Sequence, residues 1–433
     1  MENTNQKKIL RQLLTSRYGN FDHWWLLFLV WPFGAMAKAV YYFRNPKAKN
    51  IVWLFLGFFG FVFVYADPFG MGGADSARYA RNLIDLHQDW YSFDYLSTMF
   101  YSDEGTVDLY EPLVTWIVAF FTGNPRWLFT VFAAVFGWFY VQNLWMVFDK
   151  IDKRKKIDFV LLLFMVAFAL VNPIWNINGV RMWTAAQVFI FGAFKYILDK
   201  DKKGIIWILT SILFHFSFFV PAAIFLIYLF VPKNTTMIWL LVFFASSLVR
   251  ELDLSAVRNA MTFLPDFLQP RVTSYVGEQY VEKVLESKDN FGWHVKFAEM
   301  SGRYILYAWI LIVYLKGKEW LKLHPSVNRL FLLGLFLGTF AQILSNIPSG
   351  GRYMTLVSMI FYAVFVLFVS DNRMDSKVYL YKYITMPFIL FMVIFKIRIG
   401  FDYIGISAFF SNPLLALFVE DSTPVIDFVK KIF

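Results

Sequence analysis

The chain has 433 residues, of which 58% are apolar and only 17% are charged. Phe supplies 52 residues and Trp another 16, a composition that excludes a disordered protein and argues strongly against a soluble one. The net charge of +10 does not require a nucleic-acid partner, because most of the excess lies in short loops, as the positive-inside rule of membrane proteins predicts. With no Cys, disulfides, thiol nucleophiles and cysteine metal sites are excluded.

Apolar stretches that approach the roughly 20 residues needed to cross a bilayer recur along the chain. They predict an all-α, polytopic transmembrane bundle with about 11–13 membrane segments, forming a single integral membrane domain over 1–433. A basic stretch and an apolar run over 7–37 look like a signal peptide, but Pro32 argues against a cleaved one. The expected segments are 24–43, 51–66, 111–122, 126–148, 158–171, 177–198, 204–232, 236–249, 301–316, 330–345, 353–370 and 382–396, with a weaker one at 404–418.

Loop charge predicts the side of the membrane on which each loop lies. Loops rich in Lys and Arg are expected inside, and these are 149–157, 199–203, 316–329 and 371–382. The stretch 67–111 has nine acidic and two basic residues, so its acidic loop 67–110 is expected outside. The connecting order of the spans also places outside 172–180, 346–352 and the long amphipathic loop 250–300.

Two segments are expected to be half-helices. If residue 111 lies outside and residue 149 inside, 111–122 and 126–148 cannot both cross fully, so the short 111–122 is interpreted as re-entrant. Segment 204–232 is broken by a polar centre at His215 and by Pro221, which favours two half-helices. Such elements are tolerated in a membrane where they line a protein cavity.

Charged residues in apolar segments are functional candidates, because a charge near the bilayer centre costs about 2.5–3.5 kcal/mol on insertion scales. Arg181 opens a span directly after Asn178-Gly179, and Arg352 opens another after Gly350-Gly351. The alternative for each Arg is a side chain that snorkels to the headgroups. His215 lies inside an apolar helix, where it is either an ordinary hydrogen-bonded histidine or a group that handles a proton or contacts phosphate.

The acidic loop contributes further candidates. Asp75, Arg78 and Tyr79 share one helical face through their i, i+3 and i+4 spacing, with an exposed ion pair as the alternative. Glu111 starts the expected half-helix, where it is either a carboxylate favoured by the helix dipole or a general base. Arg303 is expected at the outer end of its span, lining the same cavity. No His or carboxylate stands at ligand spacing beside His215, so no metal site is predicted.

The side assignments, made from loop charge alone, place the charged candidates on one outer face. Arginines fork onto phosphate oxygens, so a cluster of Arg with carboxylates suits an anionic lipid headgroup. The outer face has no ATP, and a reaction there needs a substrate with its own activated bond. A sugar on a polyprenyl pyrophosphate is such a substrate.

At these residues the chain resembles the EpsG family of Wzy-like polysaccharide polymerases. The resemblance covers about 65–235 well, in the family's order and approximate spacing, and Arg352 stands where the family tends to carry a late Arg before a span. The matching pieces are Gly73-Ala74-Asp75 with Tyr79, Glu111-Pro112-Leu113, Asn178-Gly179-Val180-Arg181 and Phe214-His215-Phe216-Ser217.

The resemblance implies a helical bundle of the GT-C-like type in the bacterial cytoplasmic (inner) membrane, with its site facing the exterior. The implied activity joins oligosaccharide repeat units carried on undecaprenyl pyrophosphate, with a chain-length regulator as the usual partner. No cofactor is expected, and no metal is required if Arg and His side chains hold the pyrophosphate. Arg181, Arg352 and Arg78 are then expected to bind pyrophosphate. Glu111 is the first candidate for the base, ahead of Asp75 and His215, and other substrate contacts are expected from Tyr79, Asn178 and Arg303.

Three other interpretations stay open. A flippase for lipid-linked oligosaccharide also needs cations in a cavity, but it should carry charged residues along a path between both faces. An O-antigen ligase would share the pyrophosphate clamp, while a membrane acyltransferase fits His215 but does not need the Arg cluster.

The aromatics of the acidic loop are either an acceptor platform or ordinary interfacial side chains, and they are Trp90, Tyr91, Tyr95, Tyr101 and Tyr110.

Overall fold

The computed structural model describes residues 23–70, 74–89, 108–154, 156–249, 292–347, 349–371, 376–420 and 423–432. Within these ranges the chain is helical and forms no β-strand, and the β-type contacts there are two isolated bridges, Phe63 with Ile404 and Gly405 with Pro424. The all-α prediction is confirmed. The predicted likeness to GT-C-type bundles stays a prediction.

The first half of the chain includes the helices that carry the candidate site. They are α2 (Trp24–Val30), α3 (Pro32–Tyr41), α4 (Ala48–Phe61), α5 (Asp75–Asp89), α7 (Tyr110–Ala119), α8 (Pro125–Phe148), α9 (Phe159–Ala169), η1 (Ile174–Gly179), α10 (Val180–Ile197), α11 (Gly204–Phe214), η2 (Phe216–Phe218) and α12 (Phe219–Tyr228). The second half continues with α13 (Thr236–Ser246), α17 (Trp293–Lys316), α18 (Lys318–Leu323), α19 (Pro325–Leu344), η3 (Gly350–Arg352), α20 (Tyr353–Ser370), α21 (Ser376–Gly400), α22 (Ser407–Phe410), α23 (Pro413–Phe418) and α24 (Val425–Ile432).

Five helical stretches of the described chain are long and apolar enough to cross a membrane, which supports a polytopic membrane protein. They are Pro125–Phe148, Phe159–Ile197, Pro325–Leu344, Gly350–Ser370 and Leu380–Gly400. Four shorter apolar helices accompany them, namely Ala48–Phe61, Gly204–Phe214, Phe216–Tyr228 and Thr236–Ser246. The number of complete crossings stays a prediction.

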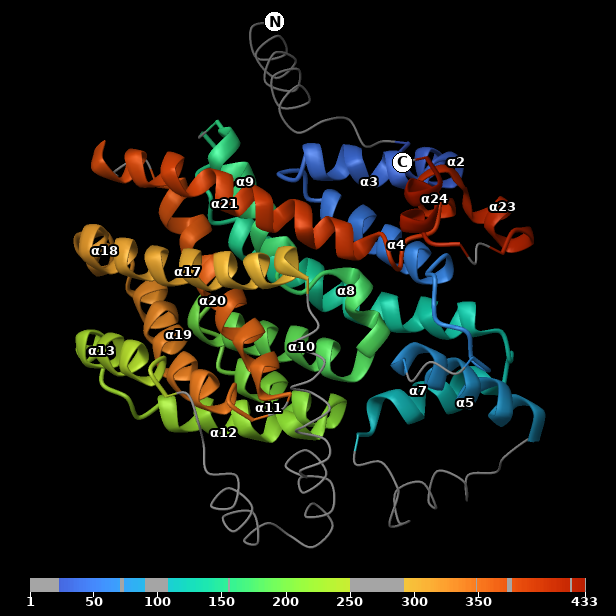
Figure 1. Ribbon diagram of the computed structural model, residues 1–433, viewed down its shortest axis with the longest axis horizontal. Helices are drawn as coiled ribbons and strands as arrows, with labels where there is room; N and C mark the ends of the chain where they lie inside the picture. Colours follow the sequence, from blue (N-terminus) through green and yellow to red (C-terminus); the bar gives the residue numbers. More distant parts are fainter. Residues whose placement is uncertain are drawn as a thin grey trace, which may run out of the picture.

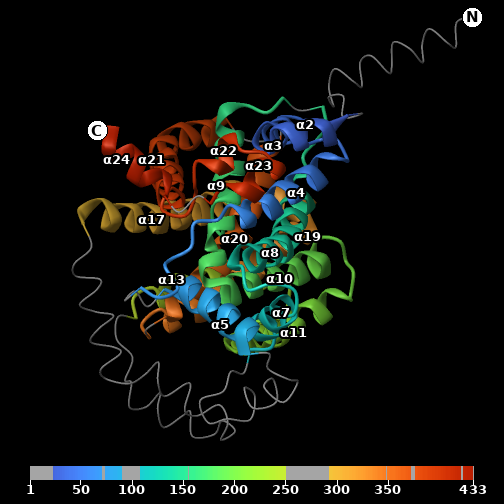
Figure 2. The ribbon, with the colours of Figure 1, turned by 90° about the vertical axis from the view of Figure 1, so that its right-hand side faces the viewer.

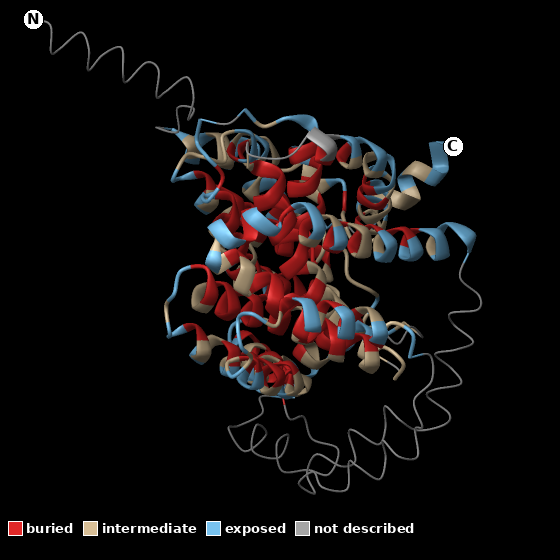
Figure 3. Cartoon of the chain, turned by 90° about the vertical axis from the view of Figure 1, so that its left-hand side faces the viewer, coloured by how far each residue is buried: buried red, intermediate tan, exposed pale blue. Residues whose placement is uncertain are grey.

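The helices pack as a bundle (Figure 1), and the buried residues lie at its centre (Figure 3). The core that they form is apolar. Helix α8 packs against α4 and α10, α10 also packs against α11, and α19 lies between α13 and α20. Helices α5 and α7 pack together at one end, whereas α22 and α23 lie near α2 and α3 (Figures 1 and 2). The α10–α11 contact depends on Gly192 and Gly204, because a Cβ on either would meet the backbone of the other helix.

Both predicted half-helical arrangements appear in the structure. Helix α7 has ten residues, which is about 15 Å of helix and half the thickness of a bilayer core. The segment 204–232 divides at His215, whose backbone is extended (φ −155°, ψ 121°) between α11 and η2.

Two expected segments differ from the prediction. Segment 24–43 is two helices, α2 and α3, because Trp31 takes a non-helical conformation (φ −150°, ψ 85°) before Pro32, as residues before proline commonly do. Segment 404–418 is not a span: it forms the short helices α22 and α23, and Pro413 starts the second. The acidic stretch 67–110 contains α5. Its residues 90–107, which include four of the five loop aromatics, lie outside the described residues. Residues 250–291 of the second loop also lie outside them.

Candidate functional site

Asp108 is the centre of a buried polar cluster that joins three distant parts of the chain. Its Oδ2 atom lies 3.0 Å from His215 Nδ1 and accepts a hydrogen bond from Arg181 Nη1 at 3.1 Å. Its Oδ1 atom accepts the backbone N–H of Phe216 at 2.7 Å. The Asp108 side chain is only 2% exposed, so this carboxylate is committed to these partners rather than to bulk solvent.

The break between α11 and η2 explains why a carboxylate binds there. The first N–H groups of a helix have no partner within the helix, and Phe216 is the first residue of η2. Asp108 provides the missing acceptor from a segment 108 positions away. The adjacent Leu109 N–H donates to the carbonyl of Leu213 at 3.0 Å, so two hydrogen bonds attach the residues just before α7 to the break between α11 and η2.

Arg181 is held by the turn that precedes it. It lies in the first turn of α10, directly after η1. Buried amides brace this turn: Asn172 Nδ2 donates to the carbonyl of Trp183 at 3.0 Å, and Gln187 Nε2 donates to the carbonyl of Asn172 at 3.1 Å. Asn176 Nδ2 also donates to Asn172 Oδ1 at 2.8 Å. These contacts fix the backbone position from which the Arg181 side chain extends.

The Arg352 turn reaches the same helix break from another part of the chain. Arg352 is exposed at the end of η3, and the hydroxyl of the next residue, Tyr353, donates to the carbonyl of Ser217 at 2.9 Å. Ser349 has a left-handed backbone (φ 67°), and a Cβ at Gly350 would collide with the carbonyl of Leu344. Only glycine fits there, so Gly350 is needed to place Arg352.

Glu111 and Tyr79 are buried beside the Asp108 cluster. The exposed fraction is 5% for Glu111 and 0% for Tyr79. Thr115 Oγ1 donates to Glu111 Oε1 at 3.3 Å, one turn along α7. The charges of Arg181 and Arg78 act on the Glu111 carboxylate, and Arg181 also interacts with Tyr79.

Asp75 and Arg78 form a more exposed layer on α5. Arg78 Nη2 donates to Asp75 Oδ1 at 2.8 Å, and both side chains are about half exposed. Asp75 faces the η1–α10 turn, because its Oδ2 lies 3.7 Å from where a Cβ on Gly179 would stand. Asn178, in the same turn, donates to the hydroxyl of Tyr403 at 3.5 Å.

Arg303 stands apart from the Asp108 cluster in its contacts. It is exposed on α17, and its charge acts on Tyr307, one turn further along the same helix. Tyr307 in turn donates to Gln342 Oε1 at 3.2 Å, on α19. Nothing in these contacts ties Arg303 to the candidate site, and its predicted substrate contact stays a prediction.

The electrostatics of Asp108 favour the ionised carboxylate. Burial alone would raise its pKa, but the hydrogen bond and charge of His215, the charge of Arg181 and the Phe216 amide together hold the pKa below its usual range. Asp108 is therefore an anion at neutral pH that balances Arg181. A carboxylate on His Nδ1 also selects the tautomer whose Nε2 accepts a proton.

Sequence reasoning identified Arg181, His215 and Glu111 but missed the residue that joins the first two. Asp108 was one of nine acidic residues in 67–111, and nothing in its immediate sequence distinguished it. One usable signal was its position three residues before Glu111, next to a helix expected at membrane depth. Among the described residues, no group of three or more His, Asp or Glu is placed to hold a metal ion.

The class of protein follows from the bundle and the site: a helical membrane protein with a buried Asp–His–Arg cluster where half-helices meet. The family model that matches this sequence is that of the EpsG family, over residues 51–409, and the chain belongs to that family. No curated protein and no solved structure matches the chain. Membership in the EpsG family suggests a polymerase role in polysaccharide biosynthesis.

Proposed function

We propose that this protein polymerises oligosaccharide repeat units carried on undecaprenyl pyrophosphate, at the outer face of the bacterial cytoplasmic membrane. The observation that carries the proposal is the contact of one Asp108 oxygen with both Arg181 and His215. It pairs a phosphate-binding cation with a proton acceptor, and a glycosyl transfer from a pyrophosphate needs both. Family membership supports the reaction class.

The donor's pyrophosphate binds the arginines. Arg181 directs Nη1 to Asp108 and also interacts with Tyr79, but a guanidinium carries five N–H donors, and in this proposal the others fork onto phosphate oxygens. The Tyr353–Ser217 hydrogen bond holds the Arg352 turn against the same helix break, so Arg352 approaches from the exposed side, and Arg78 from α5 adds a third positive charge. These cations stabilise the negative charge that grows as the glycosidic bond breaks.

The transfer itself is a displacement at the anomeric carbon. A hydroxyl oxygen of the acceptor sugar bonds to that carbon while the bond to the pyrophosphate oxygen breaks, and undecaprenyl pyrophosphate leaves with the electron pair. His215 Nε2 takes the hydroxyl proton, and Asp108 on Nδ1 orients the ring and stabilises the imidazolium that forms. The proton then passes to the departing phosphate or to solvent.

His215 replaces Glu111 as the favoured base. Glu111 was the first choice from sequence, but it is buried and its Oε1 accepts from Thr115 in the same helix, whereas the Asp108 contact orients the His215 ring. Two variants separate the roles. His215→Gln should reduce transfer at every pH, whereas Glu111→Gln should mainly raise the KM for the lipid-linked donor. The opposite pattern would return the base role to Glu111.

The experiment that tests the function is a gel of surface glycan from cells that lack this gene, beside cells complemented with it. Polymerisation predicts single repeat units in the deletion strain and restored ladders on complementation. Glycan that is absent altogether, with lipid-linked units retained on the cytoplasmic side, would favour the flippase and contradict the proposal. Free polymer that fails to reach its final acceptor would favour the ligase.

A further inference from the structure

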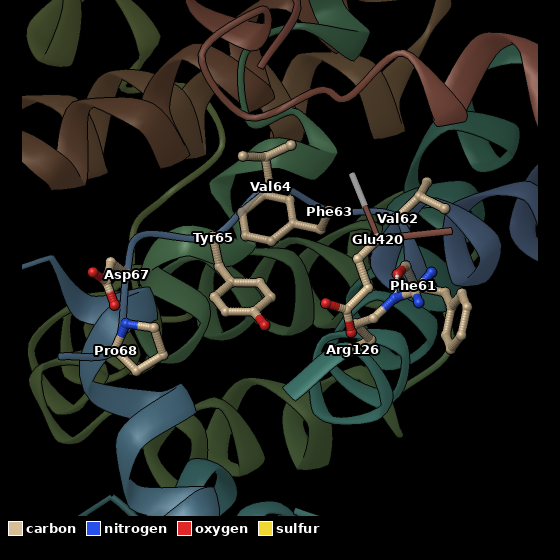
Figure 4. Close-up of a pocket in the computed structure, with 9 residues that line it drawn as sticks. All are labelled: Phe61, Val62, Phe63, Val64, Tyr65, Asp67, Pro68, Arg126 and Glu420. Atoms are coloured by element: carbon tan, nitrogen blue, oxygen red, sulfur yellow. Dashed lines mark hydrogen bonds between the residues drawn. The ribbon is translucent and has the colours of Figure 1, made fainter. Parts of the chain in front are cut away.

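A polar cavity lies outside the Asp108 cluster, between the α4–α5 connection and the C-terminal segment. Its volume is about 320 Å³, within the range of small-molecule sites. Its lining combines Tyr65 and Asp67 from the connection, Arg126 from the start of α8 and Glu420 from beyond α23 (Figure 4). The proposed chemistry at Asp108 uses none of these residues.

Arg126 forms a fixed wall of this cavity. Its side chain is buried, with Nε donating to the carbonyl of Phe61 at 3.1 Å and Nη2 donating to the carbonyl of Ala416. Its guanidinium also lies over the Phe61 ring, 4.1 Å from the centroid. Arg126 therefore joins α8, the end of α4 and α23, and it closes the cavity on one side.

The lining of the cavity also carries two carboxylates and an aromatic ring. Figure 4 shows the Glu420 carboxylate between Tyr65 and Arg126, and the Glu420 charge acts on both. The Tyr65 ring stacks on Phe129 with centroids 5.1 Å apart, which fixes its orientation. Burial and the Glu420 charge raise the pKa of the Tyr65 hydroxyl, so it remains a hydrogen-bond donor.

Direct contacts connect this cavity to the candidate site. The α4–α5 connection, which lines the cavity, is hydrogen-bonded to α5, the helix that carries Asp75 and Tyr79. The Ala66 N–H donates to Ser76 Oγ at 3.3 Å, and Arg81 Nε donates to the carbonyl of Pro68 at 2.8 Å. On the other side, the Phe63 ring stacks on Tyr403, with centroids 5.9 Å apart. Tyr403 receives the hydrogen bond from Asn178, so one residue separates the cavity wall from the Arg181 turn.

The charges of the lining define the ligand class. Two carboxylates beside one engaged arginine repel a phosphate, so an anion is disfavoured. Carboxylates accept hydrogen bonds from hydroxyl groups, the Tyr65 hydroxyl can donate one, and an aromatic ring offers an apolar face. A neutral molecule rich in hydroxyl groups satisfies all of these.

We propose that this cavity binds a neutral sugar of the incoming acceptor unit, held by Asp67, Glu420 and Tyr65. The assignment rests on the proposed polymerase function, and it deepens that function by separating the acceptor sugar from the donor pyrophosphate at Arg181. The α5 contacts then hold the acceptor at a fixed position relative to the Asp108 cluster.

The test uses the purified full-length protein in lipid nanodiscs, with a soluble probe. The probe is the repeat-unit oligosaccharide released from the cell's own polysaccharide, without lipid or pyrophosphate, and its binding is measured by saturation-transfer NMR and calorimetry. Glu420→Gln and Asp67→Asn should each weaken binding by about tenfold or more, because each loses a charged hydrogen-bond acceptor. Asp427→Asn, an exposed acid paired with Lys430 in α24, is the matched control and should bind normally.

Two further measurements separate this inference from the proposed function. Arg181→Ala should retain oligosaccharide binding while losing polymerisation, and Glu420→Gln should raise the acceptor KM with little change in kcat. Wild-type protein that polymerises, but whose two cavity variants bind the oligosaccharide as tightly as it does, would overturn the inference and leave the function intact. Wild-type protein that makes no polymer would instead remove the function on which the acceptor role rests, whatever the binding result.

Discussion

The carboxylate of Asp108 lies 3.0 Å from His215 Nδ1, although 107 positions separate the two residues in the chain. The same oxygen also accepts from Arg181. The three side chains therefore act as one unit: Asp108 fixes the histidine tautomer and keeps Arg181 in place, and a change at Asp108 alters both neighbours together.

Asp108→Asn tests this unit most simply. The amide keeps the shape of the carboxylate but loses its charge. Its NH2 group is a donor, so the amide cannot accept hydrogen bonds on both sides as the carboxylate does. We expect polymerisation to fall by about 10² or more, in line with the loss of other essential transition-state contacts. The measurement is the initial rate of polymer formation at matched protein level. Asp85→Asn, an exposed acid on α5, is the control, and equal rates for the two variants would show that Asp108 has no functional role.

Arg181→Lys tests whether the site needs the planar, forked donors of a guanidinium or only its positive charge. Lysine keeps one positive charge but cannot hold Asp108 and a phosphate with a planar set of donors. We predict that Arg181→Lys reduces the polymerisation rate by about 10²–10³. Raising the salt concentration should not cause the same reduction in the wild-type protein. The measurement compares kcat and KM for the lipid-linked donor in both proteins. A lysine variant with wild-type kcat would mean that positive charge alone is sufficient.

Gly350→Ala tests the placement of Arg352. The added Cβ collides with the Leu344 carbonyl, so the turn must move. We expect a loss of about 1–3 kcal/mol in the free energy of unfolding, together with weaker donor binding as Arg352 shifts. Gly57→Ala is the matched control, because nothing lies within 4 Å of its added Cβ and alanine favours the helix. If both variants keep wild-type stability and KM, the turn does not need its glycine.

The lowered pKa of Asp108 predicts acid sensitivity. A carboxylate whose pKa is lower in the folded than in the unfolded state stabilises the fold above the unfolded value, about 3.9, and that contribution is lost as the pH falls through the folded value. The Tm of the wild-type protein should therefore drop further between about pH 5 and about pH 2 than that of Asp108→Asn. Thermal unfolding in detergent measures both, and parallel curves would show that Asp108 is not an important charge in the fold.

The sequence predicted the helical bundle and named Arg181 and His215, which the structure brings together on Asp108, because apolar length and polar residues inside apolar runs are local signals. It correctly divided 204–232 at His215, where the polar break interrupts an apolar run. It failed at 24–43 and 404–418, where a proline outweighed the apolar composition. It could not find Asp108 or the Tyr353–Ser217 contact, because each depends on two segments that meet only when the bundle has folded.

The central claim is tested most directly by reconstitution. Purified protein in proteoliposomes, supplied with undecaprenyl-pyrophosphate-linked repeat units, should produce a ladder of polymer and release one undecaprenyl pyrophosphate per linkage. Asp108→Asn and Arg181→Lys should produce little ladder from the same substrate. Wild-type protein that forms no linkage but moves the lipid-linked unit across the bilayer would contradict the account and identify a transporter instead.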